Sequence, residues 1–239
     1  MRAAAFKAIF VVGALTVLSG CAANDDPKND NQVAGKVAFV KNCGSCHILS
    51  RAGTKGVTGP NLDQAFQQSI KDGFGRDAIR GVVHRQILYP NMNGVMPGKL
   101  VTGQTASDVA TYVADAVSSP GKDGGALADA VKPAGAGAPT VAKNGVLATE
   151  ADPNGQLAYT SNKATATPGP LEITFKNVSG VPHDVALQEG TNGPVLGKTP
   201  EITKGENKVS VTVKAGTYTF FCTVPGHRAA GMVGTLTVK

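Results

Sequence analysis

The 239-residue chain lacks tryptophan and contains only four tyrosines and eight phenylalanines. Cysteine, histidine and methionine occur four times each, and Lys and Arg outnumber Asp and Glu by only 23 to 17. No cluster of Lys and Arg interleaved with aromatic residues is present, so the composition does not indicate a nucleic-acid-binding protein. No segment has 18 apolar residues in a row, which argues against a membrane-spanning helix. Apolar residues still make up 41% of the chain, and this excludes a wholly disordered protein.

Residues 1–20 have the pattern of an export signal. The basic residues Arg2 and Lys7 precede a short apolar run that ends in Leu-Ser-Gly-Cys21, an order typical of a secretory leader. A cysteine directly after Leu-Ser-Gly resembles the lipobox of bacterial lipoproteins. The resemblance implies cleavage before Cys21, lipid on its thiol and a protein anchored to the membrane outside the cytoplasm. The polar residues 21–31 are then a flexible tether. An ordinary secreted protein with an incidental cysteine is the alternative.

The rest of the chain divides into two unlike halves. Gly, Ala and Pro dominate residues 118–144, which predicts a flexible interdomain linker. Residues 32–117 before it carry helical patterns and two cysteines. Residues 145–239 after it carry alternating strands separated by Gly, Pro and Asn. The sequence therefore predicts a helical domain followed by a β domain.

The string Cys43-Gly-Ser-Cys46-His47 is the attachment motif of c-type haem. The two thiols add to the haem vinyl groups, and the adjacent imidazole can reach the iron. A zinc site would need two further ligands at metal spacing, but the helical domain has no other cysteine. A thioredoxin-like pair would need a strand–turn–helix setting, whereas the preceding segment has a helical pattern. The motif therefore predicts one covalent haem c.

The surroundings of this motif resemble a small class I cytochrome c across residues 32–117. Gly35 and Phe39 precede the first motif cysteine by eight and four residues, where that family places a small residue and an aromatic. The last helix of this domain is predicted over Ala106–Val117, behind the capping signal Thr105-x-x-Asp108. The resemblance implies that the two helices cross near Gly35, with Phe39 packed against Tyr112.

The resemblance also implies the axial ligands of the haem iron. Pro60 would accept a hydrogen bond from the ring N–H of His47 and so orient that imidazole. The sixth ligand is expected to be Met96, because the Met-Pro pair resembles the distal loop of the family. Met92, in the same loop, and His84, in a helical run, are the alternatives. A thioether opposite histidine favours electron transfer over oxygen chemistry.

The β half carries a second set of metal-ligand residues. The spacing Cys222-x4-His227-x4-Met232 follows an alternating strand, and His183 lies earlier in the chain. Two imidazoles and a thiolate with a weak axial thioether form a blue-copper electron-transfer site. The alternative is a buried structural cysteine, a core methionine and two surface histidines.

The stretch around this spacing resembles the cupredoxin family, and its loop length is most like auracyanin or rusticyanin. The resemblance covers residues 145–239 and implies a Greek-key sandwich. Periodicity alone favours an antiparallel sandwich. Asp184 follows the first ligand, at the position where many cupredoxins carry Asn. In those proteins the Asn locks the backbone around the site, and the sequence does not show that Asp184 has the same role. The predicted fold is therefore an all-α cytochrome c domain followed by an all-β cupredoxin sandwich.

Together the two sites predict a membrane-anchored, extracytoplasmic electron-transfer protein that is not an enzyme. Both centres have a full ligand set and carry single electrons. The expected cofactors are one haem c and one type 1 copper. The expected partners are redox proteins such as an oxidase, a reductase or a reaction centre, with no small-molecule substrate and no nucleic acid.

Two other functions are weighed against this one. A subunit or fragment of a copper-containing reductase or oxidase would need a second copper site, and only His84 is left to build it. A copper-delivery protein usually exposes an open site rich in Met or Cys, whereas a single closed site is visible.

Overall fold

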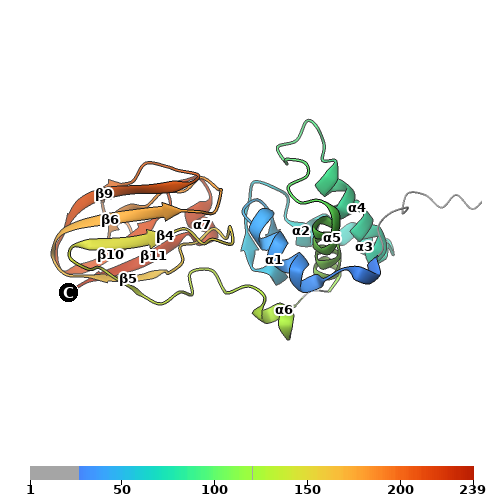
Figure 1. Ribbon diagram of the computed structural model, residues 1–239, viewed down its shortest axis with the longest axis horizontal. Helices are drawn as coiled ribbons and strands as arrows, with labels where there is room; N and C mark the ends of the chain where they lie inside the picture. The colour runs from blue at the N-terminus through green and yellow to red at the C-terminus, as the bar shows by residue number, and fades with distance from the viewer. Residues whose placement is uncertain (1–26, 120) are drawn as a thin grey trace, which may run out of the picture.

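The computed structural model describes residues 27–119 and 121–239, which form two domains lying side by side (Figure 1). The expected signal peptide, residues 1–20, and Cys21 lie outside the described residues, as does most of the expected tether. Among the described residues, no helix is both long and apolar enough to cross a membrane.

The N-terminal domain is built mainly of helices, as predicted. Asn31 caps its first helix, with the side-chain oxygen accepting the N–H of Ala34 at 3.0 Å. The elements in chain order are η1 (Pro27–Asn29), α1 (Gln32–Asn42), β1 (Ile48–Leu49), η2 (Ser50–Ala52), β2 (Thr54–Lys55), α2 (Leu62–Ala65), α3 (Gln67–Lys71), α4 (Arg76–Leu88) and α5 (Gly103–Ser118).

The helix predicted to begin at Ala106 is α5, and it begins three residues earlier than expected. Its N-cap is Thr102, so the predicted cap Thr105 lies inside the helix. Asp108, the other half of the predicted capping signal, instead accepts the backbone N–H of Asn31 at 2.8 Å. A contact between the starts of two helices therefore uses the carboxylate that the sequence pattern assigns to capping.

Helices α1 and α5 cross at Gly35, as predicted. A Cβ on that glycine would lie 2.1 Å from the carbonyl oxygen of Asp108, so a larger residue would push the helices apart. The rings of Phe39 and Tyr112 pack nearby with centroids 6.3 Å apart, and both side chains are buried. The crossing is the centre of the N-terminal core.

The segment expected to be a flexible linker contains two short elements and is bound to both domains. These are α6 (Ala126–Asp129) and β3 (Thr140–Val141). Asp123 is paired with Arg51 of the N-terminal domain, and β3 pairs with β5 (Lys163–Ala166) of the C-terminal domain. In the described part of residues 118–144, charge pairing and strand pairing therefore hold the segment expected to be a flexible linker against both domains.

The C-terminal domain is an all-β sandwich with one short helix. One sheet has the order β3-β5-β11-β10-β7-β8, and the other has the order β4-β6-β9. The remaining elements are β4 (Val146–Glu150), β5 (Lys163–Ala166), β6 (Gly169–Asn177), β7 (Ala186–Glu189), β8 (Val195–Lys198), β9 (Gly205–Val213), β10 (Gly216–Phe221), α7 (His227–Ala230) and β11 (Val233–Val238).

The sandwich is not purely antiparallel, contrary to the prediction from periodicity. Strand β4 runs parallel to β6, and β5 runs parallel to both β3 and β11. The chain crosses from β4 to β5 in the other sheet before returning to β6, and such a crossover connection gives parallel neighbours. Alternation along a single strand shows which face is buried but does not fix the direction of its neighbours.

The predicted alternation does place the core between the two sheets. On β6, Leu171, Ile173 and Phe175 are buried, and their neighbours along the strand are more exposed. Tyr218 and Phe220 on β10 face the same core. Cys222, directly after β10, continues this inward alternation and points into the sandwich at its end.

Candidate metal centre

The residues predicted to bind copper lie together at one end of the sandwich. His183 is held by a two-way backbone bridge to Ile202, with N–H to O distances of 3.0 and 2.9 Å. Cys222 follows β10, His227 is the first residue of α7, and Met232 directly precedes β11. The fold thus brings a distant histidine to the loop that carries the other three residues.

Three of these side chains converge on one point. The Nδ1 atoms of His183 and His227 are 3.0 Å apart, and the Sγ of Cys222 is 3.9 and 3.5 Å from them. The three atoms can therefore share a single ion. All three are atoms that can act as metal ligands, and a bound cation would stabilise their close approach. Two imidazoles and a thiol are also the donor set that suits copper, so the residues present fit a type 1 site.

Burial prepares these donors for a metal. It lowers the pKa of His183 to about 4, with the neighbouring His227 adding to the effect. It also lowers the pKa of His227. Both imidazoles are therefore neutral at pH 7 and able to bind a metal. Burial raises the pKa of Cys222 to about 11, so metal binding must displace its thiol proton.

Met232 lies beside Cys222 through backbone pairing. The N–H of Cys222 donates to the carbonyl of Met232 at 3.1 Å, and the N–H of Met232 donates to the carbonyl of His227 at 2.9 Å. The Met232 side chain is fully buried in the core that also holds Cys222. We call residues 222–232 the copper loop, and these bonds close it on itself.

Asp184 ties the two ligand-bearing segments together. Its carboxylate is buried, accepts the backbone N–H of Thr223 at 2.6 Å and also accepts the hydroxyl of Thr223. The residue after one ligand is thereby bonded to the residue after another. Lys198 lies 3.3 Å from the same carboxylate. Asp184 therefore joins the two ligand-bearing segments although many cupredoxins carry Asn at this position. Lys198, which no sequence pattern singles out, supplies the counter-charge of the carboxylate.

In the N-terminal domain, the predicted contact of His47 is present. Its Nδ1 lies 2.9 Å from the carbonyl oxygen of Pro60. A Cβ on Gly59 would lie 2.5 Å from the ring, so this position requires glycine. Cys43 is buried, which raises the pKa of its thiol to about 12, and Cys46 is half-buried; both are free thiols. The imidazole is therefore oriented by the loop that was predicted to orient it.

The candidate axial methionine lies on the loop between α4 and α5, which projects from the helices in Figure 1. Met96 is half-exposed, and its Sδ lies 4.0 Å from Nε2 of Gln86. Met92 is 98% exposed, and His84 is half-exposed on α4. Met96 is thus the better shielded of the two methionines.

Comparisons with known proteins match the C-terminal domain. Residues 146–239 match the family described as copper binding proteins, plastocyanin/azurin family. Plastocyanin of Solanum tuberosum is 36% identical over 94 residues, a match that covers 36% of this chain and 92% of that protein. Chloroplastic plastocyanin of Solanum lycopersicum is 35% identical over 94 residues; the match again covers 36% of this chain but only 54% of that protein, about half its length.

Among solved structures, reduced auracyanin of Roseiflexus castenholzii is 25% identical and matches 41% of this chain and 99% of its own, with a TM-score of 0.38. A TM-score this low does not by itself support a shared fold, so the assignment depends on the sequence matches and on the ligand geometry. Through its residues 146–239, the chain belongs to the plastocyanin/azurin family of copper-binding proteins.

Proposed function

We propose that this protein is an electron carrier whose C-terminal domain holds one type 1 copper. His183, Cys222 and His227 would bind the ion, with Met232 as a weak axial ligand. The observation that carries the proposal is the convergence of two Nδ1 atoms and one Sγ, the closest pair 3.0 Å apart. When bound, copper supplies a one-electron couple between its +1 and +2 states.

The protein's own residues contribute a fixed geometry for that couple. The Ile202 bridge holds His183, the closed copper loop holds Cys222 and His227, and Asp184 joins the two segments. His183 and Cys222 are almost fully buried, which keeps water from the donors. A site held this rigidly changes little when the charge of the ion changes, as fast electron transfer requires. The plastocyanins that match the chain support the same role.

The N-terminal domain, in this proposal, carries one covalent haem c. Cys43 and Cys46 would form the thioether bonds, and His47 and Met96 would be the axial ligands. Support comes from the motif, from the 2.9 Å contact between His47 and Pro60, and from the helix crossing at Gly35. The haem would supply a second one-electron couple.

The proposal also places the protein outside the cytoplasm, anchored by lipid on Cys21, where it would exchange electrons with an oxidase, a reductase or a reaction centre. The support for the anchor is the Leu-Ser-Gly-Cys21 string after a short apolar run. Intact-mass analysis of native protein is expected to show lipid on Cys21. A free N-terminus at Ala22 would contradict the anchor without affecting the copper proposal.

The copper proposal is tested by metal analysis and visible absorption of the oxidised full-length protein. We expect one copper per chain and a thiolate-to-copper absorption band, which Cys222→Ser removes. His183→Gln should lower the copper content. His84→Gln is the matched control, since it removes a histidine from α4, and it should leave the copper content unchanged. Tight binding of zinc with no uptake of copper would overturn the assignment.

A further inference from the structure

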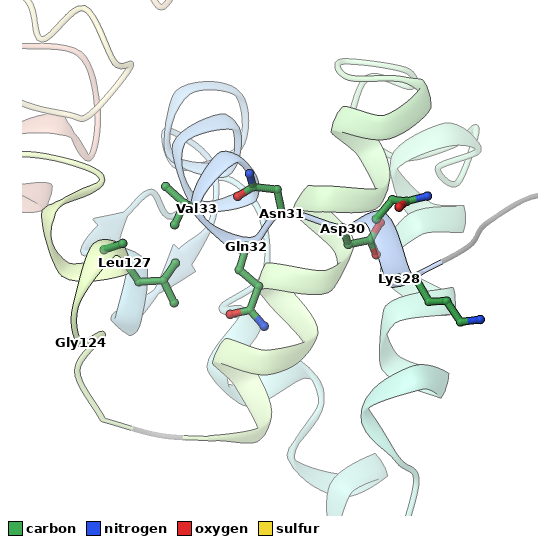
Figure 2. Close-up of a pocket in the computed structure, with 9 residues that line it drawn as sticks. Lys28, Asp30, Asn31, Gln32, Val33, Gly124 and Leu127 are labelled. Atoms are coloured by element: carbon green, nitrogen blue, oxygen red, sulfur yellow. The ribbon is translucent and has the colours of Figure 1, made fainter.

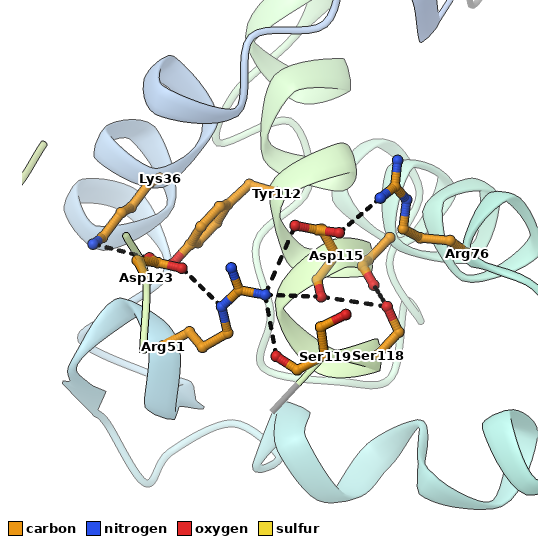
Figure 3. A network of polar contacts seen from close by, with 9 residues as sticks. Lys36, Arg51, Arg76, Tyr112, Asp115, Ser118, Ser119 and Asp123 are labelled. Atoms are coloured by element: carbon orange, nitrogen blue, oxygen red, sulfur yellow. Dashed lines mark hydrogen bonds and ion pairs between the residues drawn. The ribbon is translucent and has the colours of Figure 1, made fainter. Parts of the chain in front are cut away.

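The segment between the two redox motifs begins with a buried anchor in the N-terminal domain. The carboxylate of Asp123 is 2% exposed and lies 3.0 Å from Nζ of Lys36, 2.7 Å from Nε of Arg51 and 2.9 Å from the hydroxyl of Tyr112 (Figure 3). Burial alone would raise the pKa of Asp123, but the hydrogen bonds from these three partners hold it below the usual value. Asp123 is therefore a charged, fully paired anchor.

The next residues remain bound to the N-terminal domain. Lys36 also donates to the carbonyl of Leu127 at 2.6 Å, and Leu127 and Val131 pack against the N-terminal core. Figure 2 shows Gly124 and Leu127 beside the start of α1, where they line a shallow pocket together with Val33.

The chain passes from the N-terminal to the C-terminal domain between two consecutive residues. The carbonyl of Lys132 accepts a hydrogen bond from Nε2 of Gln156 at 3.0 Å. Val131 therefore packs on one domain while the residue after it is bonded to the other. From Gly135 onward the backbone pairs with residues 160–162, and β3 then joins the sheet through β5. We call residues 123–141 the strap, because each part of it is fastened to one of the two domains.

The two domains also touch directly beside the haem-attachment motif. A Cβ on Gly155 of the C-terminal domain would lie 2.6 Å from the carbonyl oxygen of Lys41. Lys41 is in the last turn of α1, two residues before Cys43. Gly155 is buried and has a φ of +74°, so both its conformation and the space around it favour glycine.

The copper loop faces the same region of the N-terminal domain. A Cβ on Gly226, next to His227, would lie 3.2 Å from Cγ2 of Val57, and a Cβ on Gly231 would lie 3.9 Å from Nζ of Lys55. Figure 1 shows the α7 end of the sandwich turned toward the N-terminal domain. Val57 remains 63% exposed, so the contact is light, as is common in electron-transfer encounters.

We propose that the copper loop docks on Lys55–Val57 of the same chain, held there by the strap, so that the electron partner of the copper site is the chain's own N-terminal domain. The redox meaning of this contact rests on the proposed function, whereas the contact itself does not. One electron would leave one metal and arrive at the other, with no bond made or broken. An outside partner would then exchange electrons at another face.

The test is NMR relaxation of the full-length protein as isolated, kept reduced so that any bound Fe(II) and Cu(I) are diamagnetic. We expect one rotational correlation time for both domains and a nuclear Overhauser effect between the Val57 methyl protons and the Gly226 α-protons. Two separate correlation times would overturn the proposal. A common correlation time without the Val57–Gly226 signal would also overturn it, because the docking surface would then lie elsewhere.

Two variants test the strap. Asp123→Ala removes the anchor and should cause loss of the Val57–Gly226 signal, whereas Asp129→Ala, at an exposed position of the strap, should preserve it. Because Asp123→Ala removes the carboxylate paired with the buried Lys36 and could unfold the N-terminal domain, Gln156→Ala is a second variant that detaches the strap from the other domain. If Asp123→Ala and Gln156→Ala both fold and both keep the Val57–Gly226 signal, the strap does not hold the domains together.

A final measurement separates this proposal from the proposed function. Haem and copper analysis of the same samples shows whether the cofactors are bound, independently of how the domains tumble. In loaded protein, electron exchange after flash reduction should be first order and unaffected by added viscogen, because docked domains need not diffuse together. A rate that falls with viscosity would overturn docking while leaving the two-centre carrier intact.

Discussion

The two candidate redox sites differ in how far apart in the sequence their parts lie. Cys43, Cys46 and His47 form one continuous string, and the partner of His47 is 13 residues away. The proposed copper ligands His183 and Cys222 are 39 residues apart and meet only in the folded sandwich. The first motif is therefore specified by local sequence, while the second depends on the sheet order and on the closed copper loop.

This difference predicts that each site can be lost without the other. Cys46→Ser removes one of the two cysteines that would form thioether bonds to the haem, so haem attached through two bonds should be lost. The copper content should stay at one per chain. Cys222→Ser should do the reverse. Intact mass, haem staining after denaturing electrophoresis and metal analysis measure both results. Loss of both cofactors from either variant would show that the two sites depend on each other.

The N-terminal motif does not itself supply the sixth ligand of the proposed haem iron. Met96→Ala should abolish the weak near-infrared band of a sulfur-to-iron bond in the oxidised protein. Met92→Ala should preserve that band, because its side chain is 98% exposed. The opposite pattern would assign the ligand to Met92, and loss of the band only in His84→Gln would replace methionine altogether.

The buried histidines should make the metal-free copper domain sensitive to acid. Burial lowers the pKa of His183 to about 4 from 6.5, so the unfolded chain binds more protons than the folded chain between these values. Stability is then full above pH 6.5 and falls as the pH drops toward 4, by on the order of 3 kcal/mol. Denaturant unfolding followed by NMR signals of the C-terminal domain measures this loss.

The His183→Gln variant is the control for this experiment. It has no imidazole to protonate at this position, so its unfolding free energy should fall less over the same pH range. Equal losses in the variant and the wild type would assign the acid sensitivity to other groups. Copper should protect the wild type, because a bound ion stabilises only the folded state.

The smallest expected effect concerns the charge pair beside the copper ligands. Asp184→Asn retains an oxygen for the Thr223 N–H but removes a negative charge, so the reduction potential should rise while the absorption band remains. Lys198→Gln should lower the potential. For a one-electron couple each tenfold change in relative affinity corresponds to about 59 mV, and we expect shifts within that range. Shifts of the same sign in both variants would contradict an electrostatic origin.

Some of this structure could be predicted from local patterns. Alternation on β6 and β10 identified the buried faces, and the spacing from Cys222 to Met232 identified the copper loop. The helix crossing at Gly35 was expected only from the resemblance to a class I cytochrome c. The strand alternation and the copper-loop spacing depend on residues that are neighbours in the chain, so the residue pattern alone indicates them.

Other features depend on partners far apart in the sequence. Arg51 and Asp123 are 72 residues apart, and nothing around Asp123 indicates that its carboxylate is buried. The parallel pairing of β4 with β6 follows from where β5 lies, which single-strand patterns do not encode. Lys198 contacts Asp184 only because β7 and β8 are neighbours. Composition therefore suggested a loose linker where long-range pairing creates a strap.

The place of β3 at the edge of its sheet has a practical consequence for dissecting the protein. Thr140 and Val141 pair with Ala164 and Thr165 and so cover the free edge of β5. A fragment that began at Asn144 would expose that edge, and unpaired strand edges promote self-association. A copper domain prepared alone should therefore begin before Gly135, and the shorter fragment should aggregate even with its ligand set intact.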